Sequence, residues 1–222
     1  MPPAPPLLDI PSIMGALARE YPVFSDEKEF ERAFARKIAW PRASSRTLPE
    51  ILGPRRAVDL AFKVPHKGTL SLVELKFARV AATYMVGGNR FDIRASNSSL
   101  PGKLACLNDL SRLEKIKSLR DGIEAHFVML SNDRSFWESD SADCMPREED
   151  WFVRGADEQT WRTWAYLWWH TFRDGATIAY ESPPITWNDQ EIEVVGPYSV
   201  KWHDYSRPAG GPALRYAYFF VG

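Results

Sequence analysis

The stretch of sequence that most constrains the fold is residues 57–77, AVDLAFKVPHKGTLSLVELKF. Two segments within it, 57–64 and 69–77, alternate apolar residues with others, as the strands of a sheet do. The four residues between them, 65–68, are Pro, His, Lys and Gly, a composition that favours a short hairpin loop. We therefore predict a β-hairpin at this position.

The length of this loop fixes the register of the hairpin. Val64 then faces Thr69, and the same register places Asp59 opposite Glu74. Because the side chains of a strand alternate between its two faces, one face is expected to be apolar and the other charged. The apolar face would comprise Val58, Leu60, Phe62, Val73 and Leu75. The charged face would comprise Asp59, Glu74 and Lys76.

The opposed carboxylates of Asp59 and Glu74 need a compensating partner, since like charges that face each other destabilise a sheet. A divalent cation is the simplest partner, and Mg²⁺ is commonly held by one or two carboxylates together with water and phosphate oxygens. Lys76, two residues after Glu74, would orient or help to deprotonate an attacking water and stabilise charge on a phosphate. The alternative is a solvated strand face with an ordinary Glu–Lys pair; we favour the metal site.

The order Val58-Asp59 and, fifteen positions after the aspartate, Glu74-Leu75-Lys76 resembles the motif of the PD-(D/E)xK, or restriction-endonuclease-like, superfamily, with valine in place of the proline. The resemblance implies an α/β fold with an αβββαβ core and a mixed central sheet. It also implies that Asp59, Glu74 and the Leu75 backbone carbonyl bind Mg²⁺, for which Mn²⁺ substitutes. Lys76 would then orient water for attack on a phosphodiester.

A helix is predicted for residues 26–39, where Ser25 is a suitable N-cap, acidic residues occupy the first turn and apolar residues recur at a spacing of four. In the superfamily, a helix before the hairpin often supplies a third acidic residue. The resemblance assigns this role to Glu27, with Glu31 as the alternative. An interpretation of equal weight is that both acids only stabilise the helix N-terminus or face solvent.

Residues 103–119 place leucines at helical spacing, and the apolar residues 125–130 predict a strand after that helix. The second half of the helix reads DLSRLE, and its combination with the strand resembles uncharacterised bacterial members of the same superfamily. Arg112 either pairs with Asp109 or Glu114, the interpretation that we favour, or reaches the metal site and contacts substrate.

Two connecting segments supply arginines for contact with phosphates. One is residues 40–56; the other, residues 87–102, is rich in Gly, Asn and Ser and is predicted to form a long mobile loop. The candidate substrate-binding residues in these segments are Arg55, Arg56, Arg90 and Arg94. The alternative is that these arginines only solubilise the surface.

The C-terminal part adds accessory elements. Residues 136–154 are acidic and irregular, and residues 157–172 carry tryptophans at helical spacing. That spacing predicts an aromatic helix whose stripe is buried in the core or forms a homodimer face rather than stacking on bases. Residues 191–205 and 213–221 predict a closing β-hairpin.

The expected organisation is a single domain in three segments. They are a Pro-rich lead with a short helix (1–24), a nuclease-like core (25–135) and a C-terminal extension packed on that core (136–222).

Composition bounds the function further. A formal net charge of −1 and a pI of about 6.4 carry no global signature of a nucleic-acid binder, so contact with DNA requires a local basic surface. Cys106 and Cys144 stand in unrelated contexts, which predicts a reducing compartment and neither a zinc site nor a disulfide framework. No run approaches the roughly 18 apolar residues of a membrane span, and the N-terminus lacks a basic signal region, so we expect a cytoplasmic protein without a membrane partner.

These features predict a Mg²⁺-dependent DNA endonuclease, and association with the superfamily extends this to defence against foreign DNA. Two alternatives stay open: a nuclease-like module that binds DNA or a protein without cutting, and a nuclease directed at RNA. The near-neutral charge and the acidic residues 136–154 favour the first alternative, whereas the intact set of Asp59, Glu74 and Lys76 favours an enzyme.

Overall fold

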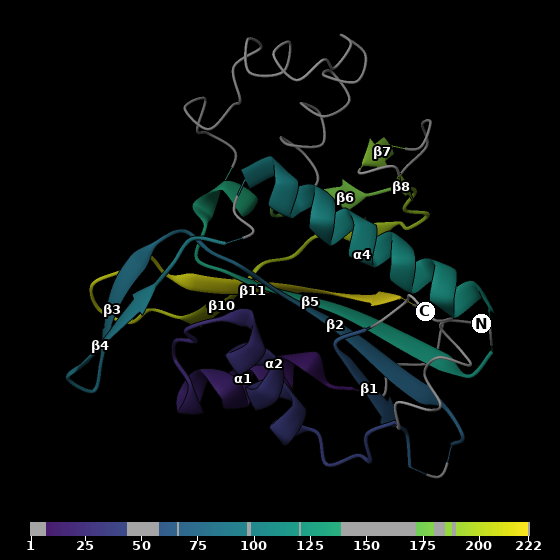
Figure 1. Cartoon of the computed structure of the whole chain (residues 1–222), viewed down its shortest axis with the longest axis horizontal. Coiled ribbons are helices and arrows are strands. Elements are labelled where there is room, and N and C mark those ends of the chain that lie inside the picture. Colours follow the sequence, from purple (N-terminus) through teal and green to yellow (C-terminus); the bar gives the residue numbers. More distant parts are fainter. Residues whose placement is uncertain are drawn as a thin grey trace, which may run out of the picture.

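A mixed five-stranded sheet with the strand order β1-β2-β5-β11-β10 runs through the centre of the fold (Figure 1). The computed structural model describes residues 8–43, 58–65, 67–96, 99–119, 121–138, 172–179, 185–187 and 190–221. The strands of the sheet are β1 Leu60–Lys63, β2 Leu70–Ala78, β5 Ile123–Ser131, β10 His203–Ser206 and β11 Leu214–Val221. β2 and β5 pair in parallel, and the other neighbours pair antiparallel.

Helices cover both faces of this sheet. The helices of the described residues are α1 Ile10–Glu20, α2 Glu27–Lys37, α4 Ser99–Leu119 and the short 3₁₀ helix η1 Arg134–Phe136. Figure 1 shows α1 and α2 on one face and α4 across the other. The molecule is therefore a mixed α/β fold in which the central strands are buried on both sides, as their near-continuous apolar sequences require.

The predicted hairpin register is confirmed. Leu60 lies opposite Val73, and the Val64 amide donates a hydrogen bond of 2.9 Å to the Thr69 carbonyl. One step beyond the Leu60–Val73 pair, the same register brings Asp59 to the level of Glu74, as the loop length predicted. The first strand begins only at Leu60, later than the predicted start at residue 57.

The predicted division of the hairpin into two faces is correct except at Val58. Leu60, Phe62, Val73 and Leu75 belong to the core under α1 and α2, as expected. Val58 instead packs against the core under α4, because the chain bends at Asp59 and interrupts the alternation of side chains. The expected charged face is also largely buried, since α4 packs over it.

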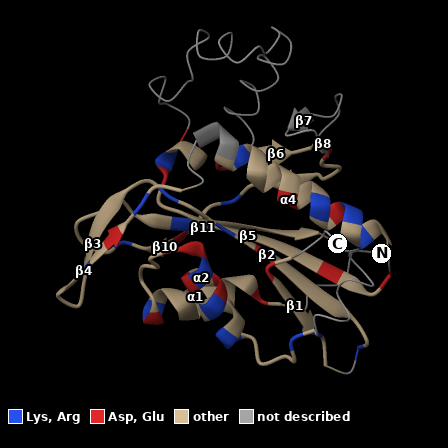
Figure 2. Cartoon of the chain, viewed as in Figure 1, with Lys and Arg blue, Asp and Glu red and all other residues tan. Residues whose placement is uncertain are grey.

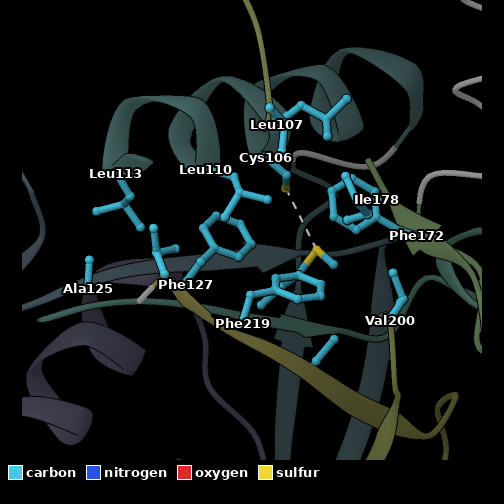
Figure 3. Close-up of a cluster of buried hydrophobic side chains, with 14 of the residues drawn as sticks. Cys106, Leu107, Leu110, Leu113, Ala125, Phe127, Phe172, Ile178, Val200 and Phe219 are labelled. Atoms are coloured by element: carbon cyan, nitrogen blue, oxygen red, sulfur yellow. Dashed lines mark hydrogen bonds between the residues drawn. The ribbon is translucent and has the colours of Figure 1, made fainter. Parts of the chain in front are cut away.

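The core under α4 is built from the helical leucine stripe and the facing side of β5. Figure 3 shows Leu110 and Leu113 pointing from the helix toward Phe127. Leu107 belongs to the same core, and the Cys106 sulfur lies 3.7 Å from that of Met129. Truncating such a fully buried leucine to alanine typically costs about 2–5 kcal/mol of stability. This packing fixes the height of α4 above β2 and β5.

The start of α2 is set by a reciprocal capping arrangement. The N-cap is Asp26, whose Oδ1 accepts a hydrogen bond of 2.7 Å from the Glu29 amide. Glu29 Oε2 in turn accepts from the amide and hydroxyl of Ser25, each at 2.7 Å. Ser25 is therefore part of the cap but is not the N-cap residue that the sequence predicted. Glu27 becomes the first residue of the helix.

The predicted mobile loop at residues 87–102 is wrong at both ends, because its first part forms a strand and α4 already begins at Ser99 rather than at residue 103. β3 Ala82–Val86 and β4 Asn89–Ile93 form an antiparallel hairpin around Gly87 and Gly88, whose φ angles are +56° and +83°. Two consecutive residues with positive φ make the tight turn that matches the twist of paired strands. This hairpin is a separate two-stranded sheet that extends beyond the central one (Figure 1).

The predicted closing hairpin is present as the β10–β11 pair, and β11 also pairs with β5. The central sheet thus draws strands from both the 25–135 and the 136–222 segments. The run at 191–205 is interrupted. The remaining short strands in the described parts of the chain are β6 Thr177–Ile178, β7 Ile185–Trp187, β8 Gln190–Ile192 and β9 Tyr198–Ser199. The predicted aromatic helix at 157–172 lies outside the described residues, apart from Phe172.

Charged residues of both signs are spread along α2 and α4 (Figure 2). Within the described part of the chain, no helix combines the length and the apolar character needed to cross a bilayer.

A glutamate on α4 ties the C-terminal segment to the helix. The Glu114 carboxylate accepts hydrogen bonds from the Val195 and Gly196 amides, each at 2.9 Å, and from the Tyr198 hydroxyl at 2.7 Å. Glu114 is therefore a link between α4 and the segment after β8, and these contacts differ from the predicted pairing with Arg112.

We expect Glu114→Ala to lower the free energy of unfolding by about 1–3 kcal/mol, because two amides and one hydroxyl lose a charged acceptor. Urea denaturation measures this change. Glu193→Ala, which removes an exposed carboxylate from the same segment, is the matched control and should change stability by less than about 0.5 kcal/mol. Equal stabilities of the two variants would contradict this assignment.

Candidate active site

Glu74 and Lys76 lie on β2 and point toward α4. The parallel ladder between β2 and β5, in which Glu74 pairs with Phe127 and Lys76 with Met129, fixes the backbone positions of both residues. Glu74 is only 3% exposed and the Lys76 side chain only 16% exposed. A Glu and a Lys this deeply covered need charged partners, because burying an unpaired charge is very costly.

Asp109 and Arg112 of α4 provide those partners. Lys76 Nζ lies 2.9 Å from Asp109 Oδ2 and 3.7 Å from Glu74 Oε1. Arg112 Nη2 lies 2.7 Å from Glu74 Oε1 and 3.0 Å from Asp109 Oδ1. The four side chains form a closed set of alternating charges, which we call the Glu74–Lys76–Asp109–Arg112 ring. Both interpretations of Arg112 hold in part, since it pairs with Asp109 and also reaches Glu74.

Asp59 and Glu27 line the edge of β2 where β1 has ended. Asp59 Oδ2 accepts a hydrogen bond of 2.8 Å from the Leu75 amide, and Glu27 Oε2 accepts one of 2.8 Å from the Phe77 amide. These amides belong to the residues two and four positions after Val73, the last β2 residue paired with β1. Because the backbone amides of a strand alternate between its two edges, both amides point to the edge at which β1 pairs with Val73. The two carboxylates therefore continue the ladder that β1 leaves incomplete.

The alternative third acid, Glu31, lies near the same edge. Burial raises the pKa of Glu31, and the charges of Asp59 and Glu27 act in the same direction. Glu27, the preferred residue of the two, is the one that binds the β2 backbone.

The cluster carries more negative than positive charge. Four carboxyl groups face two cationic groups: Glu27, Asp59, Glu74 and Asp109 against Lys76 and Arg112. Burial raises the pKa of Glu74 to about 8, assisted by the charges of Asp109 and Asp59, and Arg112 and Lys76 only partly offset this. Burial also raises the pKa of Asp59, although its hydrogen bond from Leu75 acts against the rise.

For Lys76, the effect of neighbouring charges on the pKa outweighs the effect of burial. Burial alone would lower its pKa, but the charges of Asp109, Glu27 and Glu74, together with the hydrogen bond to Asp109, raise it above the usual value. Lys76 therefore remains an ammonium group across the physiological pH range.

Two observations bear on whether these residues fit Mg²⁺. Glu74 Oε2 is buried and has no hydrogen-bond partner among the described residues, which is the state of an oxygen that lacks a ligand. In the same part of the chain, no group of three or more His, Cys, Asp and Glu side chains is arranged to hold an ion. Since Mg²⁺ commonly uses one or two carboxylates and retains water, the donor set of Asp59, Glu74 and the Leu75 carbonyl is compatible with it.

The predicted substrate-binding arginines are not brought together. Arg112 belongs to the ring, whereas Arg90 is exposed on β4, pairs with Asp92 at 3.0 Å and lies on the projecting hairpin. Arg94 is exposed just after β4, and its carbonyl accepts a hydrogen bond from Arg79. Arg55 and Arg56 lie outside the described residues.

Asp109 is the member of the ring to which the sequence assigned no role at the site. Its spacing of three from Arg112 on a predicted helix was a signal for an ion pair, but that signal gave no indication that Lys76 would join it. Comparison with known proteins adds no further assignment, because no family model, curated protein or solved structure matches the chain.

Glu74 makes the stability of the metal-free protein dependent on pH. Its folded pKa of about 8 exceeds the ordinary value of 4.5, so between these values the folded state binds more protons than the unfolded state. Stability from this group is full below pH 4.5 and is lost as the pH rises toward 8. We expect wild type to lose a few kcal/mol more than Glu74→Gln between pH 5 and 8, measured by urea denaturation in EDTA.

The exposed Glu138, which pairs with Arg134, offers a control: Glu138→Gln should follow the wild-type pH curve. Parallel curves for wild type and Glu74→Gln would show that the buried carboxyl titrates normally, against this expectation.

Proposed function

We propose that this protein is a Mg²⁺-dependent endonuclease that hydrolyses phosphodiester bonds of DNA. The observation that carries the proposal is the placement of Glu74 and Lys76 on one face of β2, with Asp59 bound to the amide of the intervening Leu75. The buried, partnerless Glu74 Oε2 and the excess of carboxyl groups support a divalent cation at this place.

Asp59, Glu74 and the Leu75 carbonyl would hold the ion, with Glu27 completing the acidic set. When bound, Mg²⁺ would supply Lewis-acid neutralisation of the charge that develops on the scissile phosphate. Asp59 and Glu27 are already oriented by the β2 amides, so little rearrangement of their backbone is required.

Lys76 acts as a cation and not as the base. Its raised pKa, maintained by Asp109, Glu27 and Glu74, keeps the proton on Nζ at neutral pH. An ammonium group donates hydrogen bonds to the attacking water and to a phosphate oxygen, which positions the nucleophile and stabilises the developing charge. Deprotonation of the water by Lys76, considered from the sequence, is the less favourable role.

Arg112 has two successive roles in this proposal. In the metal-free protein its guanidinium lies 2.7 Å from Glu74 Oε1. A divalent cation at Glu74 would compete for the same carboxylate, and the planar guanidinium is then available for a phosphate oxygen, its preferred type of partner. Arg112 therefore remains the substrate-binding candidate that the geometry supports best.

The finer fold assignment belongs to the same proposal. The chain order α2-β1-β2-β3-β4-α4-β5 has one strand more between the two helices than an αβββαβ core, and the central sheet is mixed. β3 pairs with β4 rather than with the central sheet, and this is the point at which the restriction-endonuclease-like interpretation departs from the observed topology.

A nuclease-like module that binds without cutting is the second candidate, and one observation favours it. The ring is closed by its own ion pairs, and Asp59 and Glu27 are satisfied by backbone amides, so the cluster holds together without an ion. Under this alternative, the same residues stabilise the contact between α4 and the sheet.

We expect purified protein to nick or linearise plasmid DNA with Mg²⁺ or Mn²⁺, measured by gel electrophoresis. Lys76→Ala should slow cleavage by about 10²- to 10⁴-fold, because the developing charge and the water lose their cation. Lys63→Ala, which truncates an exposed lysine on β1, is the matched control and should cleave like wild type.

A parallel incubation with RNA separates the two nucleic acids, and faster cleavage of RNA would reassign the substrate. If wild type leaves both intact with either metal but retains DNA in a gel-shift assay, the non-cutting module is the correct function.

The exposed Arg90 of β4 and Arg94 just after it generate a separate expectation. Arg90→Ala combined with Arg94→Ala should raise KM for DNA several-fold and leave kcat unchanged, because phosphate contacts remote from the reacting bond contribute to binding alone. Arg134→Ala, an exposed arginine outside that hairpin, is the control. Steady-state cleavage at two salt concentrations measures both constants, and an unchanged KM for the double variant would remove these residues from the substrate-binding set.

A further inference from the structure

We infer that Asp109 is a positioning residue, which holds the Lys76 ammonium beside Glu74 for the reaction. This inference deepens the proposed function and rests on it. Asp109 stands outside the Asp59, Glu74 and Lys76 motif and comes from α4, an element that is separate from the hairpin.

The distances single out Asp109. Among the described residues, its Oδ2 is the acidic oxygen nearest to Lys76 Nζ, at 2.9 Å, whereas Glu74 Oε1 is at 3.7 Å and lies beyond hydrogen-bond range. A lysine side chain has four rotatable bonds and loses up to about 2 kcal/mol of conformational entropy when it is fixed. The Asp109 contact is therefore what restricts Nζ to one place.

Charged groups from several elements surround Lys76. α4 contributes Asp109 and Arg112, β2 contributes Glu74, α2 contributes Glu27, and the residue before β1 is Asp59. Glu27 and Asp59 direct an oxygen to β2 amides, and Glu74 binds Arg112 more closely than Lys76. The position of Nζ between these groups thus depends on Asp109.

The second oxygen of Asp109 restrains Arg112. Oδ1 lies 3.0 Å from Arg112 Nη2, so one carboxylate contacts both cations of the ring. If Glu74 turns to a metal ion, Asp109 still holds Lys76 and Arg112, which keeps both positive groups at the site. The backbone of Asp109 is itself fixed, because its neighbour Leu110 is fully buried in the core under α4.

Stability alone does not explain this arrangement. The cost of removing two acids and two bases from water roughly cancels the attraction among them, and apolar replacements of such groups are often neutral or stabilising. A role in positioning Lys76 accounts for an acid at this place in α4.

The test is a double-mutant cycle of Asp109→Asn and Lys76→Ala on plasmid cleavage, with a spectroscopic readout. Asp109→Asn should lower kcat roughly 10- to 100-fold, more than it raises KM through Arg112, since small misplacement of a catalytic group has effects of this size. In the Lys76→Ala background, Asp109→Asn should have no further effect on kcat, because its effect on kcat acts through the lysine. Additive losses, or an unchanged kcat, would overturn the inference.

The second readout needs neither metal nor activity. With ¹⁵N-labelled lysine, the hydrogen-bonded Lys76 ammonium should give a slowly exchanging NMR signal that is absent from Lys76→Ala and lost in Asp109→Asn. The Lys63→Ala spectrum serves as the control. A Lys76 signal that persists in Asp109→Asn contradicts the inference, and so does a kcat loss that only follows a lowered Tm.

Two further outcomes separate the proposals. If wild type cleaves neither DNA nor RNA, the proposed function fails and this inference fails with it. If wild type cleaves and Asp109→Asn cleaves equally well, the inference alone fails.

Should Asp109→Asn not fold, as judged by circular dichroism, Asp109→Glu provides the same test. It keeps the charge but displaces it by one methylene, so it should reduce kcat and shift the Lys76 signal.

Discussion

The contact on which this structure depends is the pairing of Glu74 and Lys76 of β2 with Asp109 and Arg112 of α4. The two residues of β2 need the two residues of α4, and the reverse holds as well. Burying a charge without a partner between a sheet and a helix costs more free energy than the surrounding apolar contacts provide. The two elements therefore have to meet in one register. The leucine stripe of α4 packs on the sheet and provides the apolar contact, whereas the ion pairs of the ring determine where α4 lies along its axis relative to β2.

The short length of β1 creates the second half of the cluster. Had β1 continued past Leu60 toward its N-terminus, a backbone ladder would occupy the Leu75 and Phe77 amides, and Asp59 and Glu27 would have no place there. The bend at Asp59 and the capping arrangement at Asp26 bring the two carboxylates to this edge. The early end of β1 therefore has two effects: carboxylates are needed as acceptors for the β2 amides, and these carboxylates gather at one place.

The sequence was informative where the determinants are local. Loop length and alternation specified the hairpin register, and leucine spacing specified α4, because each depends on residues within a few positions of one another. The prediction from sequence was wrong at Val58, where the bend at the next residue interrupts the alternation. It was also wrong at Gly87-Gly88, which was interpreted as part of a loop but forms the turn between two strands. The contacts of Asp109 with Lys76 and of Glu114 with Val195 were out of reach, since they depend on how a helix sits on a sheet.

The position of β11 in the sheet has a consequence for biosynthesis. β11 fills the side of β5 opposite β2, yet it follows β5 by more than eighty residues in the chain. At translation rates of roughly 5–20 residues per second, the nascent chain therefore exposes an apolar strand edge for several seconds. During that interval the edge of β5 has unpaired amides and carbonyls, and pairing with residues 214–221 covers them.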